Sequence, residues 1–501
     1  MENSFLNTLK EKTNYKLTEN GGVAHKSTLD AVYDMFALGG AYRNRTDEDC
    51  ILLFKNALEE DENLALKCLF YLRDIRGGQG ERRFFRICLN WLAKEYPEVV
   101  IRNLENIAEY GRWDDLYCLV NTPVEKDMFN YMKEQFFLDM ESLAANEKEG
   151  VSLLAKWIKS ENASSKETKE LASKTRKAFH YSHKDFRKIL SQLRTRINIV
   201  EKLMSEGKWE EIEYAKLPSK AGLIYRNAFA RRDAERYNEF INNKETKVNA
   251  GTLYPYDIVK KVTDKIGWYG LNIDNTEREV LNKYWSNQID YLNGNSCKMM
   301  CVVDTSGSMD STYGGHTKPI DVAISLGMYC AERIGEPFKD YFISFSRKPK
   351  LIKVEGIDFC DKVERIYKQN LCENTDLKAV FDMLLNMYRS GNVKTEDMPE
   401  QLIVISDMEI DRGSEWEDAY EVRTEMEAIR REWAIAGVKM PRLIYWNVDA
   451  RNNTILDDVN NPEITYLSGC SPIMFESLMQ GKSGKDVMLD KLNSKRYEAI
   501  K

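Results

Sequence analysis

The sequence contains little histidine, no zinc-binding motif and no long apolar segment. Only four histidines occur among 501 residues, without an HExxH pattern, so we expect no histidine-based zinc chemistry. The ten cysteines are scattered and form no CxxC pair, which indicates reduced thiols in a cytoplasmic protein. No run of about 18 apolar residues exists, and the N-terminal MENSFLNTLKEK lacks the apolar region of a signal peptide, so we expect a soluble protein that enters no membrane.

A strong excess of charge of either sign is also missing. Lys and Arg total 73 against 80 Asp and Glu, which gives a net charge of −7. This balance excludes a protein that coats nucleic acid over its whole surface, so any anion-binding site must be local. A chain of 501 residues exceeds the usual size of one domain, and we expect about two or three domains.

Helical periodicity dominates residues 30 to 290. Thr46, with Asp49 three residues later, resembles a capping box at a helix start, and Gly77-Gly78 marks the end of a later helix. Successive helices with short connections pack most economically as a solenoid. We therefore predict that residues 1–294 form an all-α helical-repeat (HEAT-like) domain, with an irregular bundle as the alternative.

From residue 297 onward, short β-rich runs alternate with helical patterns. The predicted strands are KMMCVV (298–303), YFISFS (341–346), KLIKV (350–354), QLIVIS (401–406), RLIYWNV (442–448) and EITYLS (463–468). The helices expected between them cover 319–333, 376–389, 414–436 and 472–479. This alternation predicts a doubly wound, Rossmann-like α/β domain at 295–480, followed by a helical tail at 481–501. Only three residues separate YFISFS from KLIKV, so that pair should be antiparallel.

The sharpest local signal follows the first of these strands. Asp304, Ser306 and Ser308 alternate on a tight turn after KMMCVV, where the loops of an open α/β sheet bind ligands. Asp407 follows QLIVIS at the same edge, and Thr375 precedes the next predicted helix. Hard oxygen ligands of this kind suit a divalent metal such as Mg²⁺, with Mn²⁺ or Ca²⁺ as alternatives. A turn with helix-capping hydroxyls would use the same residue types, so the metal site is a hypothesis.

One segment opposes the sign of the whole protein. Between Lys156 and Arg196, twelve Lys or Arg stand against four acids, a local net charge of +8. Such a concentration favours phosphate contacts, and a solvated helix face is the alternative. Four aromatic residues are interleaved and either stack on unpaired bases or fill a core, namely Trp157, Phe179, Tyr181 and Phe186. The candidate RNA-binding residues of this segment are Lys174, Arg176, Lys177, Lys184, Arg187, Lys188, Arg194 and Arg196.

An arginine- and glycine-rich turn lies upstream of the basic segment. RDIRGGQGERR (73–83) places three glycines among four arginines between two predicted helices. Bare amides and guanidinium groups at such a turn suit a phosphate, whereas a glycine helix cap with surface ion pairs is an equal alternative. The candidate RNA-binding residues of this turn are Arg73, Arg76, Arg82 and Arg83.

The D-x-S-x-S motif at 304–308, with the later Thr375 and Asp407, resembles the metal-ion-dependent adhesion site (MIDAS) of von Willebrand factor A domains. The resemblance covers about 295–480. It implies that Ser306 and Ser308 bind the ion directly, and that Asp304, Thr375 and Asp407 bind it directly or through water. It also implies that a carboxylate or phosphate of a partner fills the free coordination position.

The two-part plan of the chain extends this resemblance. A helical part followed by an A domain is similar to the Ro autoantigen (TROVE) family, and RDIRGGQGER resembles an arginine and glycine segment of its helical domain. In detail, GRWDDL, SSKETKEL and YLSGCSP are more similar to an uncharacterised bacterial, phage and plant family of the same plan. Ro proteins are helical-repeat rings that bind RNA, so the resemblance implies a ribonucleoprotein.

Our leading hypothesis is therefore a non-catalytic, metal-containing RNA-binding protein, a cytoplasmic monomer that binds small structured or misfolded RNA. The alternative is a metal-dependent protein-interaction module that captures an Asp or Glu of a partner. A metal-dependent nuclease or phosphatase is disfavoured, because the motif is accompanied by no nucleophile with a base and no second set of acidic ligands.

Overall fold

The chain folds into two compact units that interleave along the sequence. The computed structural model describes residues 13–145, 150–294, 297–310, 317–369, 375–391, 393–411, 425–457 and 461–501. Described residues of 1–68 and 250–494 form one compact unit, here called the sheet unit, and those of 69–249 and 495–501 form the helical unit. The two units cut across the predicted segments 1–294 and 295–480, since both ends of the first segment pack with the sheet.

The sheet unit is built around six strands. In spatial order they are β10 (Ile464–Ser468), β9 (Arg442–Asn447), β8 (Gln401–Ser406), β5 (Met299–Asp304), β6 (Tyr341–Phe345) and β7 (Leu351–Lys353). All six predicted strands are present, and the predicted antiparallel pairing of β6 with β7 is confirmed, while the other neighbours are parallel. If the six strands are numbered 1 to 6 in chain order, starting with β5, their order from the β7 edge is 3-2-1-4-5-6. This is the strand order of a doubly wound sheet.

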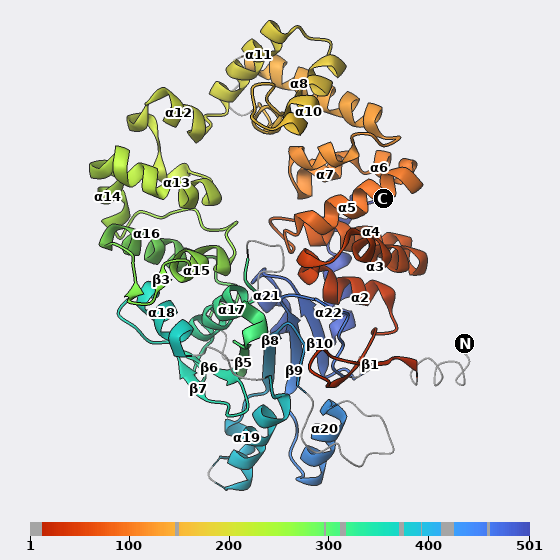
Figure 1. Cartoon of the computed structure of the whole chain (residues 1–501), viewed down its shortest axis with the longest axis vertical. Coiled ribbons are helices and arrows are strands. Elements are labelled where there is room, and N and C mark those ends of the chain that lie inside the picture. Colours follow the sequence, from red (N-terminus) through yellow and green to blue (C-terminus); the bar gives the residue numbers. More distant parts are fainter. Residues whose placement is uncertain are drawn as a thin grey trace. The chain divides into compact units, whose positions relative to one another are not determined.

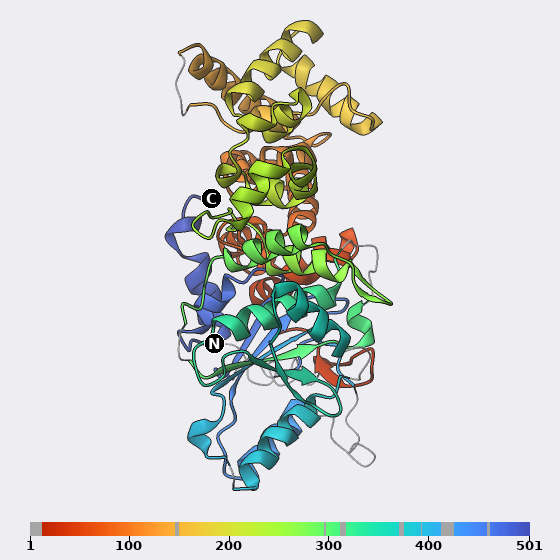
Figure 2. The ribbon, with the colours of Figure 1, turned by 90° about the vertical axis from the view of Figure 1, so that its left-hand side faces the viewer.

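Helices cover both faces of this sheet (Figures 1 and 2). The helices that lie wholly in the sheet unit are α2 (Ala31–Leu38), α3 (Asp47–Glu60), α15 (Pro255–Thr263), α16 (Asn275–Ser286), α17 (Pro319–Arg333), α18 (Phe359–Gln369), α19 (Leu377–Arg389), α20 (Glu425–Ile435), α21 (Met474–Leu478) and α22 (Gly484–Leu492). The helices predicted at 319–333, 376–389 and 472–479 are confirmed as α17, α19 and α21. Of the helix predicted at 414–436, α20 is present, and residues 412–424 lie outside the described part.

The sheet centre is fully buried. Every residue of β5 and β8 is buried, and α17 packs against β5. A Cβ added at Gly327 would lie 2.5 Å from the Val303 side chain, so glycine lets α17 approach the strand. This rigid packing fixes where the loops after β5 and β8 emerge.

The edge strand β10 is covered by the N-terminal part of the chain. The amide of Tyr466 donates to the Tyr33 hydroxyl of α2 at 2.9 Å, and the amide of Gly40 donates to the Ser468 hydroxyl at 3.1 Å. A Cβ at Gly484 would lie 1.8 Å from the Tyr33 hydroxyl, so only glycine permits this contact. Covering the edge in this way prevents pairing with a foreign strand.

Two short hairpins accompany the sheet. They are β1 (Tyr15–Leu17) with β2 (Val23–His25), and β3 (Ile266–Gly267) with β4 (Gly270–Leu271). The first hairpin is joined to the sheet unit by isolated bridges from Gly21 to Asp411 and from His25 to Ile455. The N-terminal hairpin therefore lies beside the loop that follows β8.

The helical unit confirms the helical periodicity of its part of the sequence. Its helices are α5 (Arg82–Glu95), α6 (Pro97–Arg102), α7 (Leu104–Tyr110), α8 (Glu125–Ala144), α9 (Leu154–Trp157), α10 (Lys166–Ala178), α11 (His183–Arg196), α12 (Val200–Glu206), α13 (Ser219–Arg232) and α14 (Ala234–Asn242). Helix α4 (Glu62–Arg73) runs from one unit into the other. The last residues of the chain return to this unit, where Arg496 and Tyr497 bond to Asp74.

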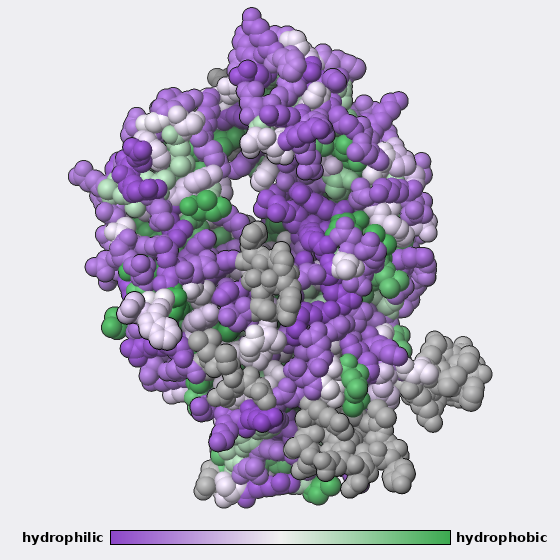
Figure 3. All heavy atoms as spheres, in the orientation of Figure 1, coloured by the Kyte–Doolittle hydropathy of each residue, from purple (hydrophilic) through white to green (hydrophobic). Residues whose placement is uncertain are grey.

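The visible surface is mainly hydrophilic, and hydrophobic residues lie in small separate groups (Figure 3). Within the described ranges, no helix has the length and apolar character needed to span a bilayer.

Asp321 of α17 provides a test of the buried packing. Its carboxylate accepts a hydrogen bond from Thr263 at 2.8 Å through one oxygen, the other oxygen has no partner among the described residues, and burial raises its pKa to about 6. The Asp321 carboxyl group therefore binds its proton more tightly in the folded state than in the unfolded state. As a result, its contribution to the free energy of unfolding is lost as the pH rises from about 4 through about 6.

We expect Asp321→Asn to remove this loss of stability at high pH. The variant should match the wild type near pH 4 and exceed its free energy of unfolding by on the order of 2 kcal/mol at pH 8. Chemical denaturation at both pH values measures the difference, and Asp264→Asn, which removes an exposed carboxylate nearby, controls for surface charge. Equal pH profiles for wild type and Asp321→Asn would contradict the prediction.

Candidate functional site

The candidate metal residues gather where the strand order of the sheet reverses. Strands β5 and β8 are neighbours, although β6 and β7 lie between them in sequence. Asp304 is the last residue of β5, and Asp407 directly follows β8. Ligands of doubly wound sheets bind outside the carboxyl ends of strands at this kind of switch point. The fold therefore brings together two acids that are distant in sequence.

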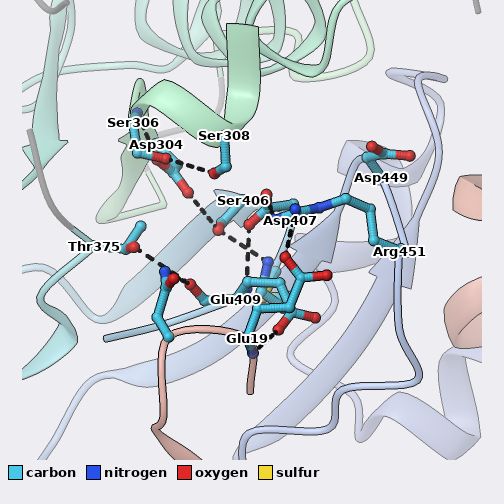
Figure 4. Close-up of polar contacts among 12 residues, drawn as sticks. Glu19, Asp304, Ser306, Ser308, Thr375, Ser406, Asp407, Glu409, Asp449 and Arg451 are labelled. Atoms are coloured by element: carbon cyan, nitrogen blue, oxygen red, sulfur yellow. Dashed lines mark hydrogen bonds and ion pairs between the residues drawn. The ribbon is translucent and has the colours of Figure 1, made fainter. Parts of the chain in front are cut away.

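The turn after β5 brings the Ser306 and Ser308 side chains close to Asp304 (Figure 4). The Asp304 carboxylate accepts from the Ser306 amide at 2.9 Å and from the Ser406 hydroxyl at 2.6 Å. The Ser306 and Ser308 hydroxyls are hydrogen-bonded to each other at 3.0 Å. Three of the five predicted ligands thus lie on one turn, held by a serine of the neighbouring strand.

Asp407 is buried and lies between this turn and an arginine. Its carboxylate accepts from the Glu409 amide at 3.1 Å and forms a 2.7 Å ion pair with Arg451. The other side of the Arg451 guanidinium pairs with Glu19 at 2.6 Å. Arg451 therefore neutralises part of the negative charge, and its approach to Asp407 occupies one carboxylate oxygen.

Burial and mutual repulsion disfavour ionisation of the two aspartates. Burial, with the nearby Asp407 charge, raises the pKa of Asp304 to about 7. Burial also raises the pKa of Asp407, although Arg451 and a hydrogen bond from Ser308 oppose the rise. Asp449, at the same edge, has its pKa raised to about 6 by burial. Acids and hydroxyls held this way form the hard-oxygen donor set that a divalent cation prefers.

Thr375 is hydrogen-bonded to the loop that follows β8, and no described hydrogen bond joins it to Asp304, Ser306 or Asp407. Its hydroxyl donates to the Glu409 carbonyl at 3.3 Å, and its carbonyl accepts from the Asp411 amide at 3.0 Å. The turn before it, residues 370–374, lies outside the described part. Among the described residues, no three His, Cys, Asp or Glu side chains are grouped to hold a metal ion. A site here would therefore depend on the serine and threonine hydroxyls.

Sequence reasoning missed three residues at this edge, namely Glu19, Ser406 and Arg451. Ser406 is the last residue of β8, and Arg451 follows β9, which was a usable signal because parallel strands end at one edge. Glu19 carried no such signal. Its amide donates to Glu409 at 2.7 Å only because the β1–β2 hairpin lies beside the β8 loop.

One of the four arginines of the arginine- and glycine-rich turn is a buried structural residue, contrary to the role predicted for it. The Arg73 side chain is 1% exposed, and its guanidinium donates twice to Asp115, at 2.7 and 2.8 Å. Gly78 passes so close to α4 that a Cβ would lie 1.9 Å from the Tyr71 carbonyl oxygen. Arg73 is therefore a structural residue that cannot reach a ligand in this fold, whereas Arg76, Arg82 and Arg83 are exposed.

The basic segment divides into engaged and exposed side chains. Lys174 pairs with Glu125, Arg176 pairs with Glu161, and Arg194 donates to the carbonyls of Ala155 and Ile158. Arg196 is half-buried. The exposed members of the predicted set are Lys177, Lys184, Arg187 and Lys188.

Three of the four interleaved aromatic residues pack in one cluster, and the fourth, Trp157, is half-buried elsewhere in the helical unit. Phe179 and Phe186 are each 2% exposed and pack with Phe136 at ring-centroid distances of 5.2 and 5.7 Å. Tyr181 joins the same cluster at 5.9 Å from Phe136. These rings stabilise α8, α10 and α11 and are not free to stack on bases.

The pairing of Arg73 with Asp115 yields a second prediction. We expect Asp115→Ala to lower the free energy of unfolding by about 3–5 kcal/mol, because it leaves a buried guanidinium unpaired. Glu109→Ala, which removes the exposed partner of Arg76, should cost less than about 1 kcal/mol. Urea denaturation measures both, and similar costs for the two variants would rule out a structural role for Arg73.

Comparison with known proteins places the chain in a family. The profile described as "Domain of unknown function (DUF2828)" matches residues 18–178 and 151–297, and that described as "Domain of unknown function (DUF7788)" matches 298–499. "Uncharacterized protein L728" of Acanthamoeba polyphaga mimivirus is 26% identical over 506 residues, covering 94% of this chain and 85% of that protein. The crystal structure of the Deinococcus radiodurans RO (RSR) protein is 14% identical, with a TM-score of 0.38 over 93% of this chain and 99% of that one. Since the first profile matches more than half of the sequence, the chain belongs to the DUF2828 family.

Proposed function

We propose that this chain is a non-catalytic RNA-binding protein that contacts backbone phosphates through exposed cations of α10 and α11. The supporting observation is the exposed basic face of α11, formed by Lys184, Arg187 and Lys188. These residues recur at i, i+3 and i+4, so their side chains lie on one side of the helix.

The charge of this face is not compensated within the described ranges, where no acid lies within ion-pair distance of its three cations. The single acid of α11, Asp185, is bonded to the capping residue Ser182. Free cations on one helix face are the usual means of binding a phosphate backbone. The choice of RNA follows the resemblance of the two-part plan and of RDIRGGQGER to the Ro family.

Charge reversal on α11 tests this proposal. We expect Arg187→Glu with Lys188→Glu to weaken RNA binding by about tenfold or more and to lower the slope of log K against log salt by about two. Fluorescence anisotropy with single-stranded and structured RNA over a salt series measures both quantities, with DNA of the same sequence as competitor.

The matched control is Arg231→Glu with Arg232→Glu, an equal charge change at exposed positions of α13. This control should change the RNA affinity much less. Unchanged affinity of the α11 variant at low salt would overturn the proposal.

A second candidate function rests on the β5–β8 edge. We infer that the sheet unit is a von Willebrand A-type domain in which Asp304, Ser306, Ser308, Thr375 and Asp407 hold a divalent cation, Mg²⁺ in the first instance. Three observations support a cation site here. Asp304 and Asp407 lie close together where the strand order reverses, and the Ser306 and Ser308 hydroxyls are hydrogen-bonded to each other beside them. When bound, the ion would offer an open coordination position to an Asp or Glu of a partner protein.

Metal addition and removal test this second function. Mg²⁺ at a hundredfold excess over its Kd should stabilise the wild type by about 2.7 kcal/mol, and Asp304→Ala or Ser306→Ala should abolish this increment. Isothermal calorimetry and thermal unfolding with and without chelator measure it, and Asp382→Ala, on an exposed part of α19, is the control. An equal Mg²⁺ effect in all variants would exclude a site at this edge.

A further inference from the structure

Six basic side chains of the helical unit gather around the turn at 111–115 and the Trp157 ring. We call this group the Arg112 cluster: Arg73, Arg82, Arg86, Arg112, Lys156 and Lys159. They come from three separate segments, namely RDIRGGQGERR with the start of α5, GRWDD, and AKW with the residues after it. Among the described residues, the acids that pair with these six cations are Asp114, Asp115 and Glu201, so the cations of the group outnumber those acids by three.

The acids of the cluster are already bonded to other groups. Asp115 accepts from Arg73, from Arg86 at 2.6 Å and from the Arg112 amide at 2.9 Å. Asp114 lies 2.9 Å from Arg86 and 3.9 Å from Lys159. Lys156 is 4.0 Å from Glu201, at the limit of an ion pair. Asp114 Oδ1 is buried without a hydrogen-bond partner among the described residues, whereas both oxygens of Asp115 accept hydrogen bonds from arginine residues.

Two guanidinium groups are left without an acidic partner. Within the part of the chain that the structure describes, neither Arg82 nor Arg112 lies within ion-pair distance of a carboxylate. Arg82 is exposed and Arg112 is half-buried. Burial, together with the charges of Arg73 and Arg82, lowers the pKa of Arg112. A half-buried cation beside like charges is stabilised when an anion enters.

The Trp157 ring contacts two cations of the cluster. The Arg112 guanidinium lies 4.9 Å from the centroid of its ring, and the Lys156 ammonium lies 5.8 Å from it. Such cation–π contacts restrict the long side chains without consuming their hydrogen-bond donors. The planar fork of an arginine that is fixed in this way matches the geometry of phosphate oxygens.

We propose that Arg82, Arg112 and Lys156 form a binding site for a phosphate group, in which the Trp157 ring contacts Arg112 and Lys156. This inference rests on the proposed RNA-binding function, because RNA would supply the phosphate. It adds to that function by naming the group of the RNA that the protein recognises. A terminal phosphate fits the excess of positive charge better than an internal phosphodiester, because a terminal phosphate carries close to two negative charges near neutral pH. Inorganic phosphate shares this chemistry and serves as the probe.

The first experiment uses the full chain and inorganic phosphate. We expect phosphate to raise the thermal midpoint of the wild type above that in chloride at equal ionic strength. The double variant Arg82→Gln with Arg112→Gln should lose this increment, and Lys156→Gln should reduce it. The control Arg231→Gln with Arg232→Gln, which removes two exposed charges from α13, should retain it. An equal midpoint in phosphate and chloride, or an increment retained by the double variant, would overturn the site.

The second experiment identifies the source of the phosphate. Short single-stranded RNAs with a 5′-phosphate, a 3′-phosphate or hydroxyl ends are compared by fluorescence anisotropy. We expect a terminal phosphate to strengthen binding, and the double variant to weaken binding of that RNA by about tenfold, the effect of losing charge-assisted hydrogen bonds. Equal weakening for all three RNAs would assign the site to an internal phosphodiester and overturn the preference for a terminal one.

The two proposals fail separately. If reversal of Arg187 and Lys188 leaves RNA affinity unchanged while phosphate still stabilises the wild type through Arg82 and Arg112, the α11 proposal falls and the phosphate site stands. If α11 reversal weakens RNA binding but the Arg82 and Arg112 variant behaves as the wild type in both experiments, only the phosphate site is removed.

Discussion

A charged side chain that leaves water needs a partner of opposite sign, and this constraint organises both units of the chain. In the helical unit, Asp115 accepts from Arg73 and Arg86, which ties the arginine- and glycine-rich turn to the turn at 111–115. In the sheet unit, Arg451 pairs with Asp407 at the edge where β5 and β8 end. Both compensations are partial. Asp304 forms no ion pair among the described residues, and neither Arg82 nor Arg112 has a carboxylate within ion-pair distance there. These are the two places where we propose ligands, a cation at the first and a phosphate at the second.

The scaffold around each place is held by close backbone contacts that admit only glycine. Gly78 lets the chain turn back onto the Tyr71 carbonyl, and Gly327 lets α17 lie directly on β5. Neither glycine belongs to a proposed binding site. Each one sets the position of a neighbouring segment that carries residues of such a site. Rigid packing of this kind is what allows side chains on separate segments to converge on one point.

Much of the fold could be predicted from the sequence, because buried strands and amphipathic helices leave periodic patterns. The meeting of Asp304 with Asp407 could be predicted as well, since parallel strands end at one edge. The role of each arginine could not. Arg73 and Arg76 belong to one motif, but Arg73 meets an acid 42 residues away and is buried, while Arg76 is exposed. The pairing of Glu19 with Arg451 spans 432 residues, and no local pattern encodes it. The aromatic residues of the basic segment were ambiguous for the same reason, because periodicity places Phe179 on a helix face but does not say what packs against it.

The contact between Tyr33 and the amide of Tyr466 has a consequence for assembly during translation. Helix α2 is made early, but the strand that it covers follows more than four hundred residues later. Residues 69–249 are synthesised between α2 and β10, and most contacts of α5 to α14 lie within that stretch. These helices can therefore fold before the strand that α2 covers has been synthesised. Contacts of such sequence separation form slowly. The face of α2 that packs on β10 is therefore left without its strand until nearly the whole chain has been made.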